Sequence, residues 1–176
     1  METSEYMEPV DIVEMIAQEH EWPHSRHNEE MVTIQHQDAY GHYHTHAAHN
    51  AGGTLFSCTR EYAPKRFSEL EVLRLLNLVN KRLEYGSMTH DLDAGFLIFK
   101  LPCDHDDDRP LERVSIEGLM ARMEELFTQY FPAFLEVAGE LKEGEVTEKD
   151  GIICLVSHAS AEDAFERAAI EQYGHA

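Results

Sequence analysis

The stretch from Ser68 to Lys100 constrains the fold most, because it carries several signals of secondary structure in close succession. Ser68 and Glu71 have the spacing of a capping box, which marks the start of a helix. Apolar residues then recur on one helical face at Val72, Leu75, Leu76, Val79 and Leu83, and Leu70, Leu73 and Leu78 widen that face. We therefore expect a core helix that is buried on more than one side.

Two strands are predicted to follow this helix. Gly86 is placed to end the helix, and residues 88–92 can then run as a short strand. The residues Asp-Ala-Gly at 93–95 are typical of a turn, and they lead into an apolar strand at 96–101. The whole stretch predicts a helix followed by a β-hairpin.

The residues before this stretch predict one helix and a three-stranded meander. Pro9 suits a first helical position, and an apolar face extends to about Glu21, where Trp22 and Pro23 stop the helix. Residues 28–37, 40–49 and 54–61 have the composition of strands separated by turn residues. We expect these three strands to pair in chain order.

The C-terminal part predicts further helices. Ser115 opens a long apolar-periodic helix that Pro132 bends or ends. Residues 139–151 read as an acidic linker, residues 152–156 as a short strand, and residues 160–173 as a closing helix. We therefore assign one α+β domain at 1–138, a linker at 139–151 and a C-terminal extension at 152–176.

The charge of the chain excludes two classes of partner. The chain has 14 Lys and Arg residues against 34 Asp and Glu residues, a formal net charge of −20 at pH 7. Such a charge repels phosphate backbones and anionic lipid, so we expect neither a nucleic-acid partner nor a membrane partner. Solubility is the simplest role for this charge, and attraction of a basic partner protein is the alternative.

The cysteines and the N-terminus predict a cytoplasmic protein. Cys58, Cys103 and Cys154 are odd in number, far apart and without a C-x-x-C pair, which indicates free thiols in a reducing compartment. The first residues, METSEYMEPV, have neither the basic region nor the apolar run of a secretion signal. No later apolar run approaches the length of a membrane span.

The predicted element order, α-β-β-β-α-β-β-α, and several sequence pieces resemble the YbjN family of bacterial sensory transduction regulators over about residues 9–138. The pieces are VDIVEMIAQEHEWP in the first helix, Asn80 within LVNKRL, the pair of strands at 88–101, and FPAFLEV near the end of the long helix. The final residues, SAEDAFERAAIEQYGHA, resemble the tail of some members.

This resemblance implies a fold and a class of function. The family is similar in fold to type III secretion chaperones, which are small acidic dimers that bind partner chains through their sheet and helices. It therefore implies an α+β fold with an antiparallel sheet flanked by helices and a non-catalytic interaction role, and it carries over no catalytic residues. The second strand, YGHYHTHAAHN, departs from the family, because the second strand of family members usually carries more aromatic and aliphatic residues than this one does.

The histidines of this strand suggest a metal site. His42, His44 and His46 alternate, so on a strand they point to one face with neighbours about 7 Å apart, and an H-x-H pair can chelate zinc. If the preceding turn is an odd-length loop centred on Ala39, His36 lies opposite His42. His36, His42 and His44 would then form a three-ligand zinc site with an open fourth position.

Other interpretations of the histidines stay open. The same register places Val32 and Ile34 on the histidine face, so the imidazoles can equally be half-buried aromatic groups that pack under a helix. Incidental binding of metal during purification is a third interpretation, and a pH-sensitive interface is a fourth. Our leading hypothesis is a cytoplasmic, non-enzymatic interaction protein, a homodimer that binds a partner protein or peptide in a chaperone-like or regulatory role without a cofactor. The alternative is a zinc-binding protein or zinc-dependent hydrolase.

Overall fold

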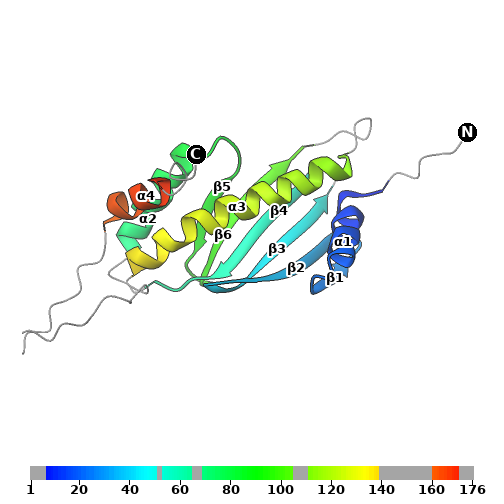
Figure 1. The fold of residues 1–176 in the computed structure, drawn as a ribbon, viewed down its shortest axis with the longest axis horizontal. Helices are drawn as coiled ribbons and strands as arrows, with labels where there is room; N and C mark the ends of the chain where they lie inside the picture. Colours follow the sequence, from blue (N-terminus) through cyan, green and yellow to red (C-terminus); the bar gives the residue numbers. More distant parts are fainter. Residues whose placement is uncertain (1–6, 51–52, 65–68, 105–110, 139–159, 171–176) are drawn as a thin grey trace, which may run out of the picture. The chain divides into compact units, whose positions relative to one another are not determined.

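The computed structural model describes residues 7–50, 53–64, 69–104, 111–138 and 160–170. It confirms the predicted α+β class: the described residues form an antiparallel sheet of six strands and four helices (Figure 1). The elements are α1 (Pro9–Glu19), β1 (His24–Asn28), β2 (Met31–Asp38), β3 (Gly41–Asn50), β4 (Gly53–Glu61), α2 (Glu69–Arg82), β5 (Ser87–Asp91), β6 (Phe96–Cys103), α3 (Arg113–Ala138) and α4 (Ala161–Ile170). The six strands lie in the order β1-β2-β3-β4-β6-β5.

The chain divides into two compact units. The first comprises Met1–Tyr62 and Glu84–Leu126, and the second comprises Ala63–Leu83 and Phe127–Ala176, so helix α3 contributes residues to both. The assignment of residues 1–138 to one domain, 139–151 to a linker and 152–176 to an extension stays a prediction. The predicted linker, the predicted strand at 152–156 and the predicted helix cap Ser68 lie outside the described residues.

In the first unit, the sheet has one face packed under helices. Fully buried side chains alternate along its strands, among them Val32, Ile34, Ala47, Phe56 and Phe99, as expected for a sheet with one face in the core. The two helices of this unit lie on this face, which we call the covered face, since α1 carboxylates reach Arg26 and Glu124 of α3 reaches Thr45. The remaining strand residues form the opposite face, which we call the open face.

Strand β1 was not expected from the sequence, so the predicted three-stranded meander is in fact four-stranded. Strand β1 has the sequence HSRHN, which lacks the alternating apolar residues that indicate a strand. It forms because Asn28 pairs with Met31 across a two-residue turn, which folds the segment back along β2. Tertiary pairing therefore decides its structure, and local propensity does not.

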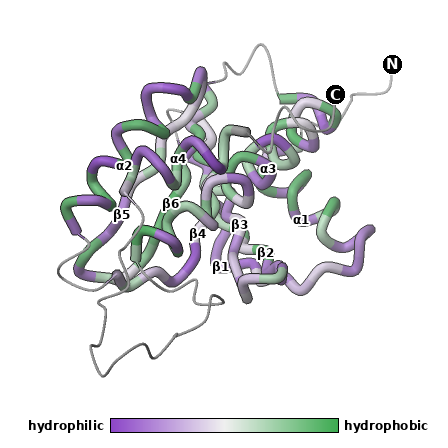
Figure 2. The backbone as a smooth tube through the Cα atoms, turned by 60° about the vertical axis from the view of Figure 1, so that its left-hand side comes forward, coloured by the Kyte–Doolittle hydropathy of each residue, from purple (hydrophilic) through white to green (hydrophobic). Residues whose placement is uncertain are grey.

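The second unit consists of helices α2 and α4 and the C-terminal part of α3. The buried face of α2 comprises Val72, Leu75, Leu76 and Val79, and the backbone N–H of Ala161 in α4 donates to Glu71 of α2 at 3.0 Å. The expectation that α2 is buried on more than one side is wrong, because Leu70 and Leu73 are 59% and 56% exposed. The alternation of hydrophobic and hydrophilic residues along α2 is visible in Figure 2.

Helix α3 does not end at Pro132, which lies inside it and is followed by helical residues to Ala138. Fully or almost fully buried side chains occur before and after this proline, as at Met123 and Phe134. Pro132 has no backbone N–H and so removes one hydrogen bond of the helix, but the burial of side chains on both sides of it stabilises the helix enough to continue. Among the described residues, no helix combines the length and apolar character needed to cross a bilayer.

Candidate functional site

The register of β2 and β3 differs from the one that the zinc hypothesis requires. The two strands are joined by Ala39 and Tyr40, an even-length loop, and His36 lies opposite Tyr43 while Gln37 lies opposite His42. A shift of one residue moves a side chain to the other face of a sheet. His36 is therefore on the covered face, whereas His42 and His44 are on the open face, and the predicted three-histidine site is not formed. Over the described part of the chain, no group of three or more His, Cys, Asp or Glu residues is placed to hold a metal ion.

On the open face, histidines and threonines form a hydrogen-bonded row across four strands. His27 Nε2 lies 2.9 Å from Thr33 Oγ1, which lies 2.9 Å from His46 Nδ1, and His46 Nε2 lies 2.8 Å from Thr59 Oγ1. Burial lowers the pKa of His46 to about 4, so this imidazole is neutral at pH 7. The two ring nitrogens of His46, on β3, thus contact Thr33 of β2 and Thr59 of β4, and this histidine has a structural role in linking the strands.

His36 is held among aromatic rings on the covered face. Its ring stacks on Tyr43 with centroids 4.9 Å apart and meets the edge of Trp22 at 5.2 Å. Its Nε2 atom lies 3.3 Å from Glu124 Oε1 of α3 without making a hydrogen bond. Burial lowers the pKa of His36 to about 4 and raises the pKa of Glu124. This is the half-buried, packed role that the sequence analysis left open as an alternative.

A buried arginine lies beside this cluster. Arg60 is 3% exposed, its guanidinium carbon lies 5.0 Å from the ring centroid of Tyr43, and it donates to Asp38 Oδ2 at 2.6 Å. Burial and the neighbouring Glu124 raise the pKa of Tyr43, so its hydroxyl stays protonated. Groups with shifted pKa values often mark catalytic sites, and here His36 lies against both Tyr43 of the sheet and Glu124 of α3.

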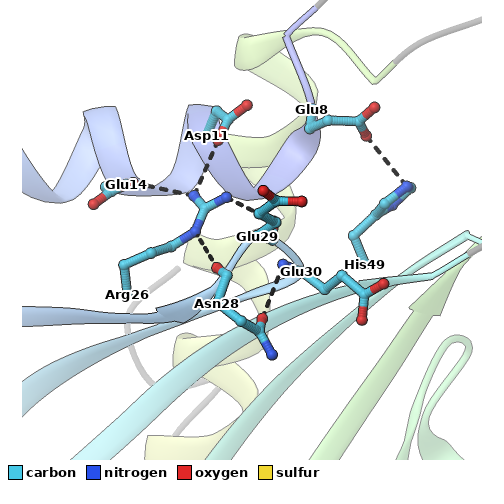
Figure 3. A network of polar contacts seen from close by, with 8 residues as sticks. All are labelled: Glu8, Asp11, Glu14, Arg26, Asn28, Glu29, Glu30 and His49. Carbon is cyan, nitrogen blue, oxygen red and sulfur yellow. Dashed lines mark hydrogen bonds and ion pairs between the residues drawn. The ribbon is translucent and has the colours of Figure 1, made fainter.

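The outer edge of β1 is obstructed. The register of β1 and β2 shifts between Arg26 and Asn28, and the guanidinium of Arg26 donates to the backbone oxygens of Asn28 and Glu29 at 2.5 and 2.6 Å. The same guanidinium binds Asp11 and Glu14 of α1 at 3.0 and 3.1 Å, as Figure 3 shows. Bulges and charged side chains are devices that keep an edge strand from pairing with another chain.

Among its described residues, the opposite edge of the sheet has no register shift and no lysine or arginine side chain, and it carries the charged residue Asp91. Strand β5 pairs with β6 in an unbroken register from Ser87 to Asp91, and its sequence, SMTHD, contains no proline, lysine or arginine. Two large apolar side chains flank it, Tyr85 at 77% and Leu92 at 59% exposure. We call residues 84–93, with β5 at their centre, the β5 edge, and we take it as the candidate functional site.

Both ends of β5 are fixed by local structure. Gly86 has a φ of +77°, and a Cβ atom there would lie 2.6 Å from the Lys100 backbone oxygen, so only glycine allows this close approach. At the other end, Asp91 Oδ1 accepts hydrogen bonds from the backbone N–H groups of Asp93 and Ala94. Within the strand, His90 Nε2 lies 3.0 Å from the Tyr62 backbone oxygen, a contact that ties β5 to the sheet.

No family model and no curated protein matches the chain, and the resemblance to the YbjN family stays a prediction. A comparison with solved structures finds a chain of the heterodimeric ExoU-SpcU complex from the type III secretion system of Pseudomonas aeruginosa. It is 22% identical, with 58% of this chain and 86% of that chain covered, at a TM-score of 0.32. A TM-score this low supports no inference about function.

The sequence analysis did not single out the residues of the β5 edge. It placed residues 88–92 in a strand, but the exposure of Tyr85 and Leu92 depends on which strand ends the sheet, and that follows from tertiary pairing. One signal was present, namely two large apolar residues beside turn residues and carboxylates in a segment without lysine or arginine. This sequence signal does not distinguish a strand at the exposed edge of a sheet from a strand buried inside it.

Proposed function

We propose that this chain is a non-enzymatic protein that binds a partner protein or peptide at the β5 edge, in a chaperone-like or regulatory role. The observation that carries the proposal is the pair of exposed apolar side chains, Tyr85 and Leu92, at the two ends of a regular terminal strand. Large exposed apolar side chains that lie close together are typical of a surface that binds another chain.

The state of the buried polar groups supports a binding role over catalysis. Burial raises the pKa of Cys58 to about 12, so its thiol is not a nucleophile at neutral pH. His36 Nε2 lies 3.3 Å from Glu124 Oε1, and the guanidinium of Arg60 lies over the ring of Tyr43, all within the first unit. Cys58 and Cys103 are free thiols, which supports the cytoplasm as the compartment of this proposal.

A pull-down with matched variants tests the proposal. The full chain with a small tag is used to capture proteins from its own cells, and so are the double variant Tyr85→Ser/Leu92→Ser and the control Val114→Ser. Val114 is 76% exposed near the start of α3 and is not part of the β5 edge. Substitutions at exposed positions are expected to leave folding intact.

The proposal predicts a partner that the wild type and Val114→Ser retain at similar amounts in quantitative mass spectrometry. The double variant is expected to lose at least nine tenths of that partner while keeping the wild-type circular dichroism spectrum and thermal midpoint. Equal recovery of the same partner by all three proteins would show that the β5 edge is not the binding surface.

A further inference from the structure

We infer that the first unit contains an acid-sensitive latch, in which the neutral imidazole of His36 holds Trp22 and residues 113–126 of α3 against the sheet, and protonation of His36 releases them. This inference goes beyond the proposed function, because it concerns the covered face of the sheet and not the β5 edge. It rests on the position of His36 between three elements, on its burial and on the charged groups around it.

His36 lies on β2 at a point where three other parts of the first unit meet. Its ring stacks on Tyr43 of β3 with centroids 4.9 Å apart, and it meets the ring of Trp22, which follows α1, at 5.2 Å. Its Nε2 atom lies 3.3 Å from Glu124 Oε1 of α3. A change in the charge of this one ring therefore acts on the loop after α1, on the sheet and on α3 together.

The surroundings of His36 favour its neutral form. Its side chain is 9% exposed, and its Nε2 atom makes no hydrogen bond. A protonated imidazole carries a charge and two N–H donors, which need partners or water when the ring is buried. Burial accordingly lowers the pKa of His36 from 6.5 to about 4. The charged ring favours an open state, in which water reaches it.

The charged groups near His36 do not offset the cost of burying its second proton. The titratable side chains come from the elements around the ring, namely His20 and His24 beside Trp22, Asp38 of β2, Tyr43 and His44 of β3, Arg60 of β4 and Glu124 of α3. Asp38 already accepts a hydrogen bond from Arg60 at 2.6 Å. A charge on His44 lowers the pKa of His36 further.

Glu124 acts in the opposite direction to His36. Burial raises the pKa of Glu124, and the hydrogen bond from Thr45 offsets part of this change. Glu124 therefore becomes neutral at a higher pH than an exposed glutamate does, which weakens its attraction for a protonated His36. The closed state also binds a proton at Glu124 that the open state releases, and this opposes opening in acid. We expect acid to open the latch, and to open it further when Glu124 cannot titrate.

The size of the effect of His36 follows from its two pKa values. The closed state has a His36 pKa of about 4, and the open state restores the ordinary value of 6.5. The open state therefore binds more protons between these pH values, and acid favours it. Through His36 alone, the ratio of open to closed molecules rises about twentyfold between pH 7 and pH 5.

Amide hydrogen exchange of the full chain at pH 7 and pH 5, corrected for the intrinsic exchange rates, measures this opening. The latch amides are those of Trp22, whose N–H donates to the Ala17 oxygen at 2.9 Å, and of residues 116–126 in α3. The amides of Phe56 in β4 and Phe99 in β6, whose side chains are 0% and 1% exposed, report on the sheet itself.

Three variants isolate the contribution of His36. His36→Phe keeps an aromatic ring that can stack on Tyr43 but binds no proton. Glu124→Gln removes the opposing titration. His42→Gln is the matched control, because it removes an exposed histidine of the open face. His36→Leu replaces His36→Phe if the latter changes the circular dichroism spectrum at pH 7.

Between pH 7 and pH 5, the protection of the latch amides is expected to fall about twentyfold further in the wild type than in His36→Phe. His46 is present in both proteins, so its effect on stability cancels in this comparison. Glu124→Gln is expected to lose more protection than the wild type, and His42→Gln the same amount. Phe56 and Phe99 are expected to stay at least tenfold better protected than the latch amides at pH 5.

Three results would overturn the latch. An equal fall in protection in the wild type and in His36→Phe would show that His36 does not control the opening. A smaller fall in the wild type than in His36→Phe would show that Glu124 holds the protonated imidazole in the closed state. The same fall at Phe56 and Phe99 as at the latch amides would show that the whole sheet opens, without local release of α3.

Discussion

Replacing Gly86 with alanine is expected to destabilise the protein far more than replacing Gly95, although both glycines have a left-handed backbone. Their φ values are +77° and +71°, so alanine meets a similar conformational cost at each, about 1–2 kcal/mol. Alanine also lowers the entropy of the unfolded chain, which offsets about 0.4–1 kcal/mol of that cost at either position. Backbone strain alone therefore predicts a loss of about 1 kcal/mol in both variants.

The two positions differ in their surroundings. A Cβ atom at Gly86 would lie 2.6 Å from the Lys100 backbone oxygen and 2.8 Å from Phe99 Cζ, whereas a Cβ atom at Gly95 would meet nothing within 4 Å. Relief of the first contact requires a shift of β6 backbone, and overpacking of this kind costs about 1–3 kcal/mol. The expected loss is thus about 3 kcal/mol for Gly86→Ala and about 1 kcal/mol for Gly95→Ala.

Urea denaturation of the two variants and the wild type, followed by circular dichroism, measures this difference. The midpoints are compared only if the variants share the same m-value, the slope of the free energy of unfolding against urea concentration, because a changed m-value would indicate a change in the denatured state. If the two variants lose the same stability to within about 0.5 kcal/mol, the close approach of Gly86 to β6 does not exist in solution. That result would contradict the packing of Gly86 and β5 against β6 described here.

Three further predictions follow from the polar groups of the first unit. Burial lowers the pKa of His46 from 6.5 to about 4, so between these pH values the unfolded chain binds more protons than the folded chain, and the free energy of unfolding falls as the pH falls. When urea denaturation is repeated at pH 7 and pH 5, the fall in the free energy of unfolding should be about 1 kcal/mol smaller for His46→Gln than for the wild type. Asp38→Asn weakens the ion pair with the buried Arg60 and is expected to lower the free energy of unfolding by about 2 kcal/mol in the same urea assay; an unchanged midpoint would show that the pair adds no stability. Zinc binding stays a prediction, and because His36 lies on the covered face, it would depend on the histidines of β3 alone. In a zinc titration, His42→Ala should therefore weaken zinc binding at least tenfold, and His36→Ala should leave it unchanged. The opposite pattern would contradict the register of β2 and β3 described here.

Most helices and strands were predictable because their residues follow a clear period. The hairpin of β5 and β6 was found from Gly86 and the Asp-Ala-Gly turn, and α2 and α3 were found from their apolar spacing. Strand β1 was not found, because HSRHN has no apolar alternation and pairs with β2 only through tertiary structure. The width of the buried face of α2 was overestimated, since spacing shows which residues share a face but not what covers it.

The histidine site depended on one residue of register, and this is why it failed. Residues 38–41, Asp-Ala-Tyr-Gly, allow loops of different length, and the sequence offered no means to choose the two-residue loop at Ala39 and Tyr40. That choice sends His36 to the covered face. The β5 edge was missed for a related reason, since strand order within the sheet decides which strand lies at an edge.

Backbone hydrogen exchange of the full chain, with and without the partner recovered in the pull-down, tests the central claim most directly. Partner binding at the β5 edge predicts that amides of Ser87–Asp91 gain protection on binding, while those of His24–Asn28 in β1 keep their exchange rates. Gained protection at β1 or at the helices, with β5 unchanged, would contradict the account and place the partner elsewhere.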